Sequence, residues 1–161
     1  MKPKHIMITV LLAGLVLVTA GCTGGSNSQS GPVKAKWITV TVSGDQVSIP
    51  QSDVDKYTNV HFNVPTSNYG PLAFMAYNLD GKTYVRANVC PPCNSIGFSL
   101  DNGVLVCDSC GTLFEADTGN GISGGCVAYP KEEVAYTVQN GQIVMNINDA
   151  ITAYGATVQV G

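Results

Sequence analysis

Apolar and polar residues alternate with a period of two through most of the chain after residue 34, which is the pattern of strands that bury one face. In the stretch 37–42, three aliphatic residues alternate with Trp37 and two threonines, which predicts one strand. Further strands are expected at 46–49, 60–64, 72–78, 83–89, 134–138, 142–147 and 157–160. No amphipathic pattern predicts a helix longer than two turns. The expected fold is therefore all-β, a sandwich or a barrel.

Tight turns separate several of these strands. Asp80-Gly81, Asn102-Gly103 and Asn140-Gly141 each stand between two strand-like runs, and such pairs supply the positive φ angles of two-residue hairpins. One short helix is expected at 52–57, with Ser52 as its N-cap and acidic residues in its first turn.

The first 21 residues have the features of a secretory signal. A short basic stretch ending at His5 precedes an apolar run over 6–18, and small residues follow up to Cys22. Because the small residues end at a cysteine, we expect a lipoprotein signal peptide with Cys22 acylated. An ordinary cleaved signal and an uncleaved anchor are the alternatives. All three place the rest of the chain outside the cytoplasm, and lipidation places it at the cell membrane, on the extracytoplasmic face.

Beyond the signal, the composition predicts a tether and one domain. Residues 22–33 are nearly all small or polar, so they cannot bury enough apolar surface to fold. Residues 34–161 are long enough for a single β domain with a sizeable core.

Charge argues against one class of partner. The whole chain has a formal net charge of −3, which becomes −5 if residues 1–21 with their two lysines are removed. Only 12% of residues are charged and there is no basic run to neutralise phosphates, so nucleic acid is not expected as a partner. Membrane attachment would come from the acyl chains at Cys22.

Two C-x-x-C motifs provide the strongest chemical signal. Cys90-Pro91-Pro92-Cys93 and Cys107-Asp108-Ser109-Cys110 are separated by the thirteen residues 94–106, which contain one predicted hairpin turn. Two such motifs can direct four thiolates to one point, as zinc and iron-sulfur sites require. Thiolates suit both metals, so the ligands alone do not choose between them.

Disulfides are the main alternative, because the chain is expected in an oxidising compartment. With Cys22 lipidated, five cysteines remain, and an odd number leaves one thiol over. A redox-active dithiol is a further alternative, but such motifs open a helix and no helical pattern follows Cys93. The C-x-x-C spacing favours a metal site.

No motif predicts an enzyme. The only histidine after the signal is His61, which has no nearby nucleophile in sequence and is interpreted as a surface or cross-strand residue. Glu132-Glu133 and Asp108 are interpreted as solvated carboxylates, although Asp108 stands between two predicted ligands. The aromatic residues Tyr69, Tyr77, Tyr84 and Phe98 are expected in the core.

Two resemblances follow from these motifs. The order of cysteine loop, hairpin, L-V-C-D-x-C-G-x-x-F, glycine loop and closing hairpin over about 85–147 is similar to the layout of the cluster-binding subdomain of Rieske proteins. Rieske centres use two cysteines and two histidines, so this chain, with cysteines at all four positions, has the layout without the ligand set.

A closer resemblance is to the membrane iron-sulfur family called FtrD-like, over about 37–148. It is carried by V-S-I-P at 47–50, C-P-P-C at 90–93, V-C-D-S-C-G at 106–111, Phe114 and G-G-C at 124–126. The resemblance implies an extracytoplasmic domain with an iron-sulfur or related metal centre, in some members associated with iron-uptake permeases. Two features differ from the family. This chain has a predicted lipid anchor in place of several membrane spans. After the first cysteine motif it has Ile96-Gly97-Phe98, where other members often have an aromatic or basic pair.

The resemblance also implies a ligand set. Cys90, Cys93, Cys107 and Cys110 would bind the metal, with Cys126 as an additional sulfur near the centre; a free or structural thiol is the alternative for Cys126. The expected function is a lipid-anchored one-electron carrier, or an accessory to iron transport, with a redox protein or iron permease as partner. The alternatives are a β binding module stapled by zinc, without redox activity, and a secreted sandwich closed by disulfides.

Overall fold

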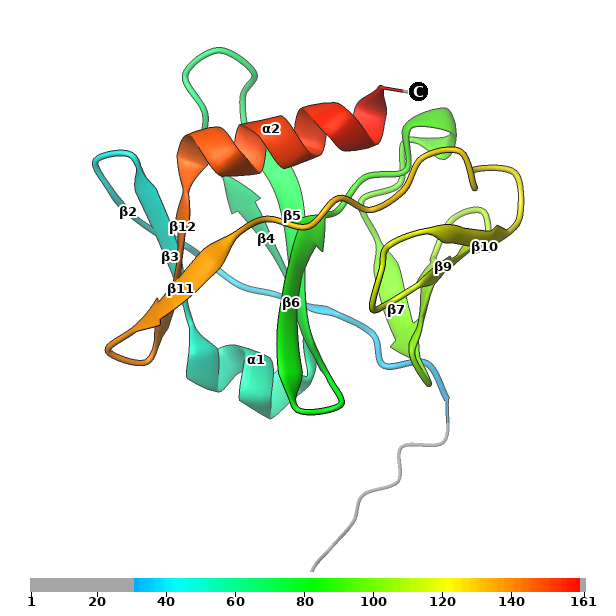
Figure 1. The fold of residues 1–161 in the computed structure, drawn as a ribbon, viewed down its shortest axis with the longest axis horizontal. Coiled ribbons are helices and arrows are strands. Elements are labelled where there is room, and N and C mark those ends of the chain that lie inside the picture. The colour runs from blue at the N-terminus through cyan, green and yellow to red at the C-terminus, as the bar shows by residue number, and fades with distance from the viewer. Residues whose placement is uncertain (1–30, 160–161) are drawn as a thin grey trace, which may run out of the picture.

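The computed structural model describes residues 31–159, which form three four-stranded sheets and two α-helices (Figure 1). The first sheet has the order β1-β4-β5-β6, with β1 at Lys36–Trp37, β4 at Asn59–Val64, β5 at Leu72–Leu79 and β6 at Lys82–Ala87. The second has the order β11-β12-β3-β2, with β2 at Thr41–Ser43, β3 at Gln46–Pro50, β11 at Tyr136–Gln139 and β12 at Gln142–Asn146. The third has the order β10-β9-β8-β7, with β7 at Phe98–Asp101, β8 at Val104–Cys107, β9 at Leu113–Glu115 and β10 at Gly121–Ser123. The helices are α1, Gln51–Tyr57, and α2, Ile147–Val158, and a 3-10 turn, η1, spans Pro91–Cys93.

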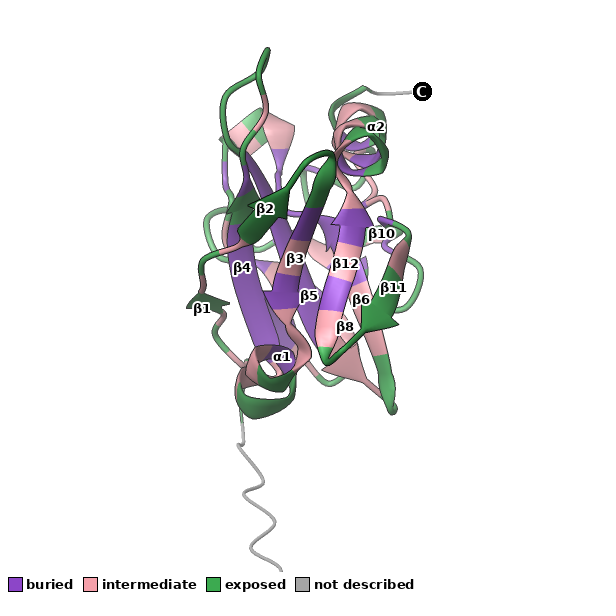
Figure 2. Cartoon of the chain, turned by 90° about the vertical axis from the view of Figure 1, so that its left-hand side faces the viewer, coloured by how far each residue is buried: buried purple, intermediate pink, exposed green. Residues whose placement is uncertain are grey.

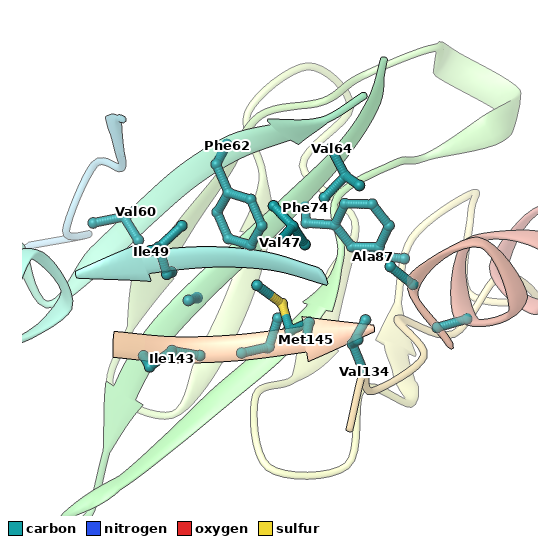
Figure 3. Close-up of a cluster of buried hydrophobic side chains, with 14 of the residues drawn as sticks. Val47, Ile49, Val60, Phe62, Val64, Phe74, Ala87, Val134, Ile143 and Met145 are labelled. Atoms are coloured by element: carbon teal, nitrogen blue, oxygen red, sulfur yellow. The ribbon is translucent and has the colours of Figure 1, made fainter. Parts of the chain in front are cut away.

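The first two sheets form a sandwich around the main core. Alternate residues of β3, such as Val47 and Ile49, are fully buried against Phe62 and Phe74 of the facing sheet (Figure 3). The outer strands β2 and β11 are mostly exposed, whereas β4 and β5 are buried (Figure 2). The period-two pattern is therefore the pattern of a sandwich, and the predicted all-β class is confirmed.

Strand β5 is shared by two cores. Phe74 and Ala76 face the main core, while Met75 and Tyr77 face a second cluster that includes the third sheet. Burial on both faces explains why β5 is a nearly continuous apolar run rather than an alternating one. The third sheet, in which Cys107 ends β8, therefore packs against β5 through this second cluster and lies beside the sandwich (Figure 1).

The three predicted hairpin turns are present. Both central residues have positive φ at Asp80-Gly81, Asn102-Gly103 and Asn140-Gly141. The turn at Asn102-Gly103 joins β7 to β8 and places Phe98 opposite Cys107 in the ladder. A local turn signal therefore sets the register of the strand that carries one cysteine motif.

The C-terminal segment differs from its prediction. Residues 157–160 were expected as a strand and no helix beyond two turns was expected, but α2 has 12 residues and includes Thr157. The buried residues of α2 are Ala150, Ala153 and Thr157, but Ile147, Ile151 and Tyr154 pack on the same core. The apolar spacing of a helix is therefore present in this segment, and the prediction missed it. The Asn146 side chain caps the helix by accepting a hydrogen bond from the backbone N–H of Asn148 (2.8 Å).

Three smaller predictions are also wrong. The single strand at 37–42 is divided, because β1 pairs in parallel with β4 and β2 pairs with β3 of the other sheet. The residue at the N-cap of α1 is Pro50, with no side-chain hydrogen bond, so Ser52 lies inside the helix. Tyr69 is 67% exposed and outside the core. Tyr77 and Phe98 are buried as expected, and Tyr84 stacks on Tyr77.

The signal, Cys22 and most of the predicted tether lie outside the described residues. The last residue of the tether, Val33, pairs with Leu100 through two backbone hydrogen bonds of 2.7 and 3.0 Å. None of the helices within residues 31–159 has the length and apolar character needed to span a membrane.

Candidate metal centre

The first cysteine motif is held in a compact turn. The backbone N–H of Cys90 donates to the carbonyl of Ser95 (2.8 Å), and that of Cys93 donates to the carbonyl of Cys90 (3.2 Å). Proline suits the first positions of such a turn because its φ is already fixed. Asn94, with φ of 55°, ends the turn. The two thiols are therefore fixed relative to each other by local backbone structure.

The second motif follows directly from β8. Cys107 is the last residue of the strand, and its N–H donates to the carbonyl of Thr112 (2.9 Å). The chain then turns back, with the N–H of Gly111 donating to the carbonyl of Cys107 (2.9 Å). Gly111 has a φ of 69°, which glycine adopts at little cost.

The structure brings the four predicted ligand thiols together. The Sγ atoms of Cys90, Cys93, Cys107 and Cys110 all lie within 4.8 Å of one another, and those of Cys93 and Cys107 are 3.7 Å apart. Metal–thiolate bonds of about 2.3 Å separate the four sulfurs of a tetrahedral site by about 3.8 Å. Both the donor atoms and their spacing thus fit a metal held by four thiolates.

The four thiols differ in exposure. Cys90 and Cys107 are buried, and burial raises the pKa of each. Cys110 is exposed, and hydrogen bonds from the side chain and backbone of Thr112 lower its pKa to about 6. Cys110 is therefore the thiol on the solvent side of the group and a thiolate at neutral pH, the form that binds metals.

Cys126 lies beside this group rather than within it. Its Sγ is 3.7 Å from that of Cys110, but the group with mutual distances below 4.8 Å contains only the other four thiols. Thr112 joins the two residues, because its Oγ1 accepts a hydrogen bond from the N–H of Cys126 (3.3 Å) and lies 3.2 Å from the Sγ of Cys110.

The glycine-rich loop at 119–125 packs closely on its neighbours. A Cβ atom on Gly124 would lie 2.7 Å from the Cα of Thr112, and one on Gly119 would overlap the carbonyl of Lys131. Glycine at these positions allows close backbone approach and does more than form turns. The loop thereby holds Cys126 and Thr112 against the thiol group.

Asp108, which lies between the two cysteines of the second motif, is held by hydrogen bonds. The carboxylate of Asp108 accepts hydrogen bonds from Lys34 (2.8 Å) and Ser99. Burial tends to raise the pKa of Asp108, but these two donors outweigh it and the pKa is lowered. Asp108 is thus a fixed charge rather than a freely solvated carboxylate.

His61 is a cross-strand residue, opposite Met75, and is buried rather than on the surface. Burial lowers its pKa to about 4, against the opposing effects of the Asp108 carboxylate and the carbonyl of Phe98. Although distant in sequence from both cysteine motifs, His61 is therefore close enough to Asp108 to feel its charge. It is not in the thiol group.

Two residues near the thiols were not predicted from the sequence. Lys131 is fully buried, with its Nζ donating to the carbonyl of Val89 (2.6 Å). In sequence, Lys131-Glu132-Glu133 has the appearance of a charged surface run, so no local signal indicates this position. Thr112 also has no motif of its own, and its contacts with Cys110 and Cys126 depend on the folded loop.

A protein-family model described as "Membrane iron-sulfur containing protein FtrD-like" matches residues 56–154, which is more than half of the chain and includes both cysteine motifs and Cys126. The chain belongs to the FtrD-like family. The resemblance stated from the sequence is confirmed, and the family is one of membrane iron-sulfur proteins.

Two solved structures are similar to this chain. A chain in the "Complex of reduced oxygenase and oxidized ferredoxin in carbazole 1,9a-dioxygenase" matches with a TM-score of 0.52 at 20% identity, over 65% of this chain and 95% of that one. The ferredoxin of Sphingomonas yanoikuyae B1 matches with a TM-score of 0.42 at 23% identity, over 52% of this chain and 83% of that one. The likeness to the first is one of fold and agrees with the predicted Rieske-like layout. No significant match was found among curated proteins.

The family and the thiol group together support a metal-binding role with an iron-sulfur or other metal cofactor. The ligand set in the described residues is four thiols, with no histidine among them. The layout is thus Rieske-like, while the donor chemistry is that of an all-cysteine centre.

Proposed function

We propose that this protein is a one-electron carrier whose iron-sulfur centre is held by Cys90, Cys93, Cys107 and Cys110. The observation that carries the proposal is the spacing of these four thiols, all within 4.8 Å of one another in a family of iron-sulfur proteins. Bound iron would supply a reversible one-electron change, and anionic sulfur ligands favour its oxidised state.

The position of the thiols supports transfer to a partner rather than chemistry on a substrate. Cys110 is exposed while Cys90 and Cys107 are buried, so the site has one edge near solvent and is otherwise enclosed. An electron could leave through that edge to a docked redox protein without any bond being made or broken. We infer that the protein is a carrier or accessory and not an enzyme.

The cellular setting we propose is the extracytoplasmic face of the cell membrane. A lipid at Cys22 would anchor the chain, and residues 23–33 would let the β domain reach a partner in the membrane. That partner would be a redox protein or an iron permease, since the family is one of membrane iron-sulfur proteins.

Anaerobic purification of the full-length protein in mild detergent tests the proposal. We expect iron to copurify, with a visible absorption spectrum that bleaches on reduction and an electron paramagnetic resonance signal in one redox state. Sulfide analysis then separates a cluster, which contains inorganic sulfide, from a single iron held by the same thiols. Iron-free protein whose thiols bind no metal when iron or zinc is added would disprove the proposal.

A structural zinc site is the second candidate, because the sulfur spacing fits one tetrahedral ion bound directly by the four thiolates, whether that ion is zinc or iron. The 3.7 Å between Cys93 and Cys107 is close to the edge of about 3.8 Å in a tetrahedral zinc–thiolate site. Zinc would stabilise the two loops without redox change. Colourless protein containing stoichiometric zinc, with no iron taken up during anaerobic expression in iron-rich medium, would support this candidate.

A further inference from the structure

Lys131 lies between the glycine loop and β11, and its side chain is buried. The residue has no exposed surface, and its Nζ donates a hydrogen bond to the carbonyl of Val89, the residue directly before Cys90. A lysine in this position is unusual because the cost of burying an ammonium group is large unless an opposite charge is near.

The ammonium contacts two aromatic rings of the buried cluster that contains three of the thiols. It is 4.4 Å from the ring centroid of Phe114 and 5.3 Å from that of Phe98. Both rings pack in the cluster that contains Cys90, Cys107 and Cys126. Within residues 31–159, no ion pair joins Lys131 to a carboxylate.

One carbonyl and two ring faces stabilise an ammonium but do not neutralise it. Burial lowers the pKa of Lys131 to about 8, against the opposing charges of Cys90, Cys107, Cys126 and Cys93. The cysteines are therefore the source of negative charge for this buried cation.

The backbone of Lys131 is fixed on both sides. Its N–H donates to the carbonyl of Gly119 (2.8 Å), and its carbonyl accepts from Nη1 of the buried Arg86 (2.8 Å). Arg86 is fixed in turn by Tyr77, whose hydroxyl accepts from Nε (2.9 Å). The ammonium is thus held beside the thiols by contacts that do not involve the cysteines.

We propose that Lys131 is a positioning residue that acts as the built-in counter-cation of the four-thiolate centre. This inference rests on the proposed metal site. A divalent ion held by four thiolates leaves a net negative charge, so a fixed ammonium nearby stabilises the metal-bound state. In a redox-active centre the reduced state carries one more negative charge, and Lys131 stabilises that state further and raises the reduction potential.

This role differs from that of a side chain that only fills space, because the two states of the protein respond differently. Without metal, replacing the ammonium by an apolar chain removes its hydrogen bond to Val89 and its contacts with two rings, and the loss of stability is limited to these contacts. With metal, the same replacement leaves the thiolates without their cation. A purely structural lysine would give equal losses in both states.

The test uses the full-length protein with Lys131→Met, which keeps much of the side-chain length without the charge. Lys36→Met, at an exposed position of β1, is the matched control. Zinc affinity is measured by competition with a chromophoric chelator, and the melting temperature is measured with and without zinc. We expect Lys131→Met to bind zinc about tenfold more weakly, and to show a larger drop in melting temperature relative to wild type with zinc than without it. The control should match wild type in all three.

Reduction potential is the second readout for protein loaded with iron. We expect the potential of Lys131→Met to be lower than that of wild type, and that of Lys36→Met to be unchanged. If Lys131→Met does not fold, Lys131→Gln, which keeps a donor for the Val89 carbonyl, replaces it in every measurement.

The outcomes separate this inference from the proposed function. Unchanged zinc affinity in the Lys131 variant, or equal destabilisation with and without metal, would overturn the counter-cation role and leave the metal site intact. Wild-type protein that binds neither zinc nor iron would overturn both. Wild-type protein that binds zinc but never iron would overturn the electron-carrier function, while the affinity comparison still decides the role of Lys131.

Discussion

The thiol sulfur of Cys126 lies 3.7 Å from that of Cys110, although Cys126 is outside the group of four thiols that lie within 4.8 Å of one another. Cys126 is buried, and the backbone N–H of Cys126 donates a hydrogen bond to Oγ1 of Thr112. We therefore expect it to pack beside the metal rather than to bind it.

This relationship predicts different outcomes for two cysteine substitutions. Cys107→Ser should abolish metal retention, because it removes a buried member of the four-thiol group. Cys126→Ser should retain most of the metal. Metal content per chain after desalting measures both. If the two variants lose metal equally, Cys126 is a full ligand and the four-thiol assignment is wrong.

Thr112 is expected to control the reactivity of Cys110 in the metal-free protein. Its hydroxyl is the largest contribution to the lowered pKa of Cys110, which is about 6. Thr112→Val removes the hydroxyl at nearly constant volume, so the pKa should rise toward its ordinary value and the thiolate fraction at pH 7 should fall. The rate of alkylation at Cys110, followed by mass spectrometry across pH 5–9, measures this.

Thr112→Ser is the matched control, because it keeps the hydroxyl and removes only a methyl group. Its alkylation profile should resemble that of wild type. The prediction fails if Thr112→Val and Thr112→Ser give the same profile, since the shift would then not depend on the hydroxyl.

The parts of the fold that could be predicted from sequence depend on local chemistry. Asn102-Gly103 forms a tight hairpin turn wherever two strands flank it, because its residues tolerate positive φ. A C-x-x-C turn such as Cys90–Cys93 likewise brings two thiols together through its own backbone hydrogen bonds. The hairpin and the two cysteine motifs together were enough to predict the convergence of the four thiols.

The parts that could not be predicted depend on contacts between distant segments. Helix α2 was missed for another reason, because Ile147, Ile151 and Tyr154 recur at helical spacing and pack on the core, but the end of this segment was interpreted as a strand. Lys131 is buried only because Phe98 and Phe114 from the third sheet cover it. Neither phenylalanine is near Lys131 in sequence, so the residues around that lysine give no signal that its side chain is buried.

The buried histidine predicts a pH dependence of stability. Burial lowers the pKa of His61 from 6.5 to about 4, and its Nε2 has no hydrogen-bond partner among residues 31–159. Since the folded pKa is below the unfolded one, the unfolded state binds the proton first as pH falls. The free energy of unfolding is therefore unaffected by protonation of His61 above pH 6.5. It falls by about 2–3 kcal/mol as the pH decreases from 6.5 to 4.

Urea unfolding of metal-free protein across pH 4–7 measures this effect. His61→Gln removes the titrating group, so the difference in unfolding free energy between wild type and variant should narrow as the pH falls through this window. Asp108 contributes little to the difference because its pKa is lowered and it titrates below the window. Parallel pH profiles for the two proteins would contradict the assignment of the effect to His61.

The close approach of the glycine loop to Lys131 gives a steric prediction. Gly119 has a φ of 82°, and a Cβ there would overlap the carbonyl of Lys131 and lie 2.9 Å from Nη1 of Arg86. Gly119→Ala should therefore lower the free energy of unfolding by at least about 1–3 kcal/mol, the usual cost of a strained backbone, with a further cost for the displaced carbonyl.

Gly125→Ala, six residues later in the same loop, is the control, because a Cβ there has no heavy atom within 4 Å and its φ is not positive. Its stability should stay within about 0.5 kcal/mol of wild type. Chemical denaturation of both variants measures the difference, and a Gly119→Ala protein as stable as Gly125→Ala would show that the loop does not need this close contact to hold Lys131 beside the thiols.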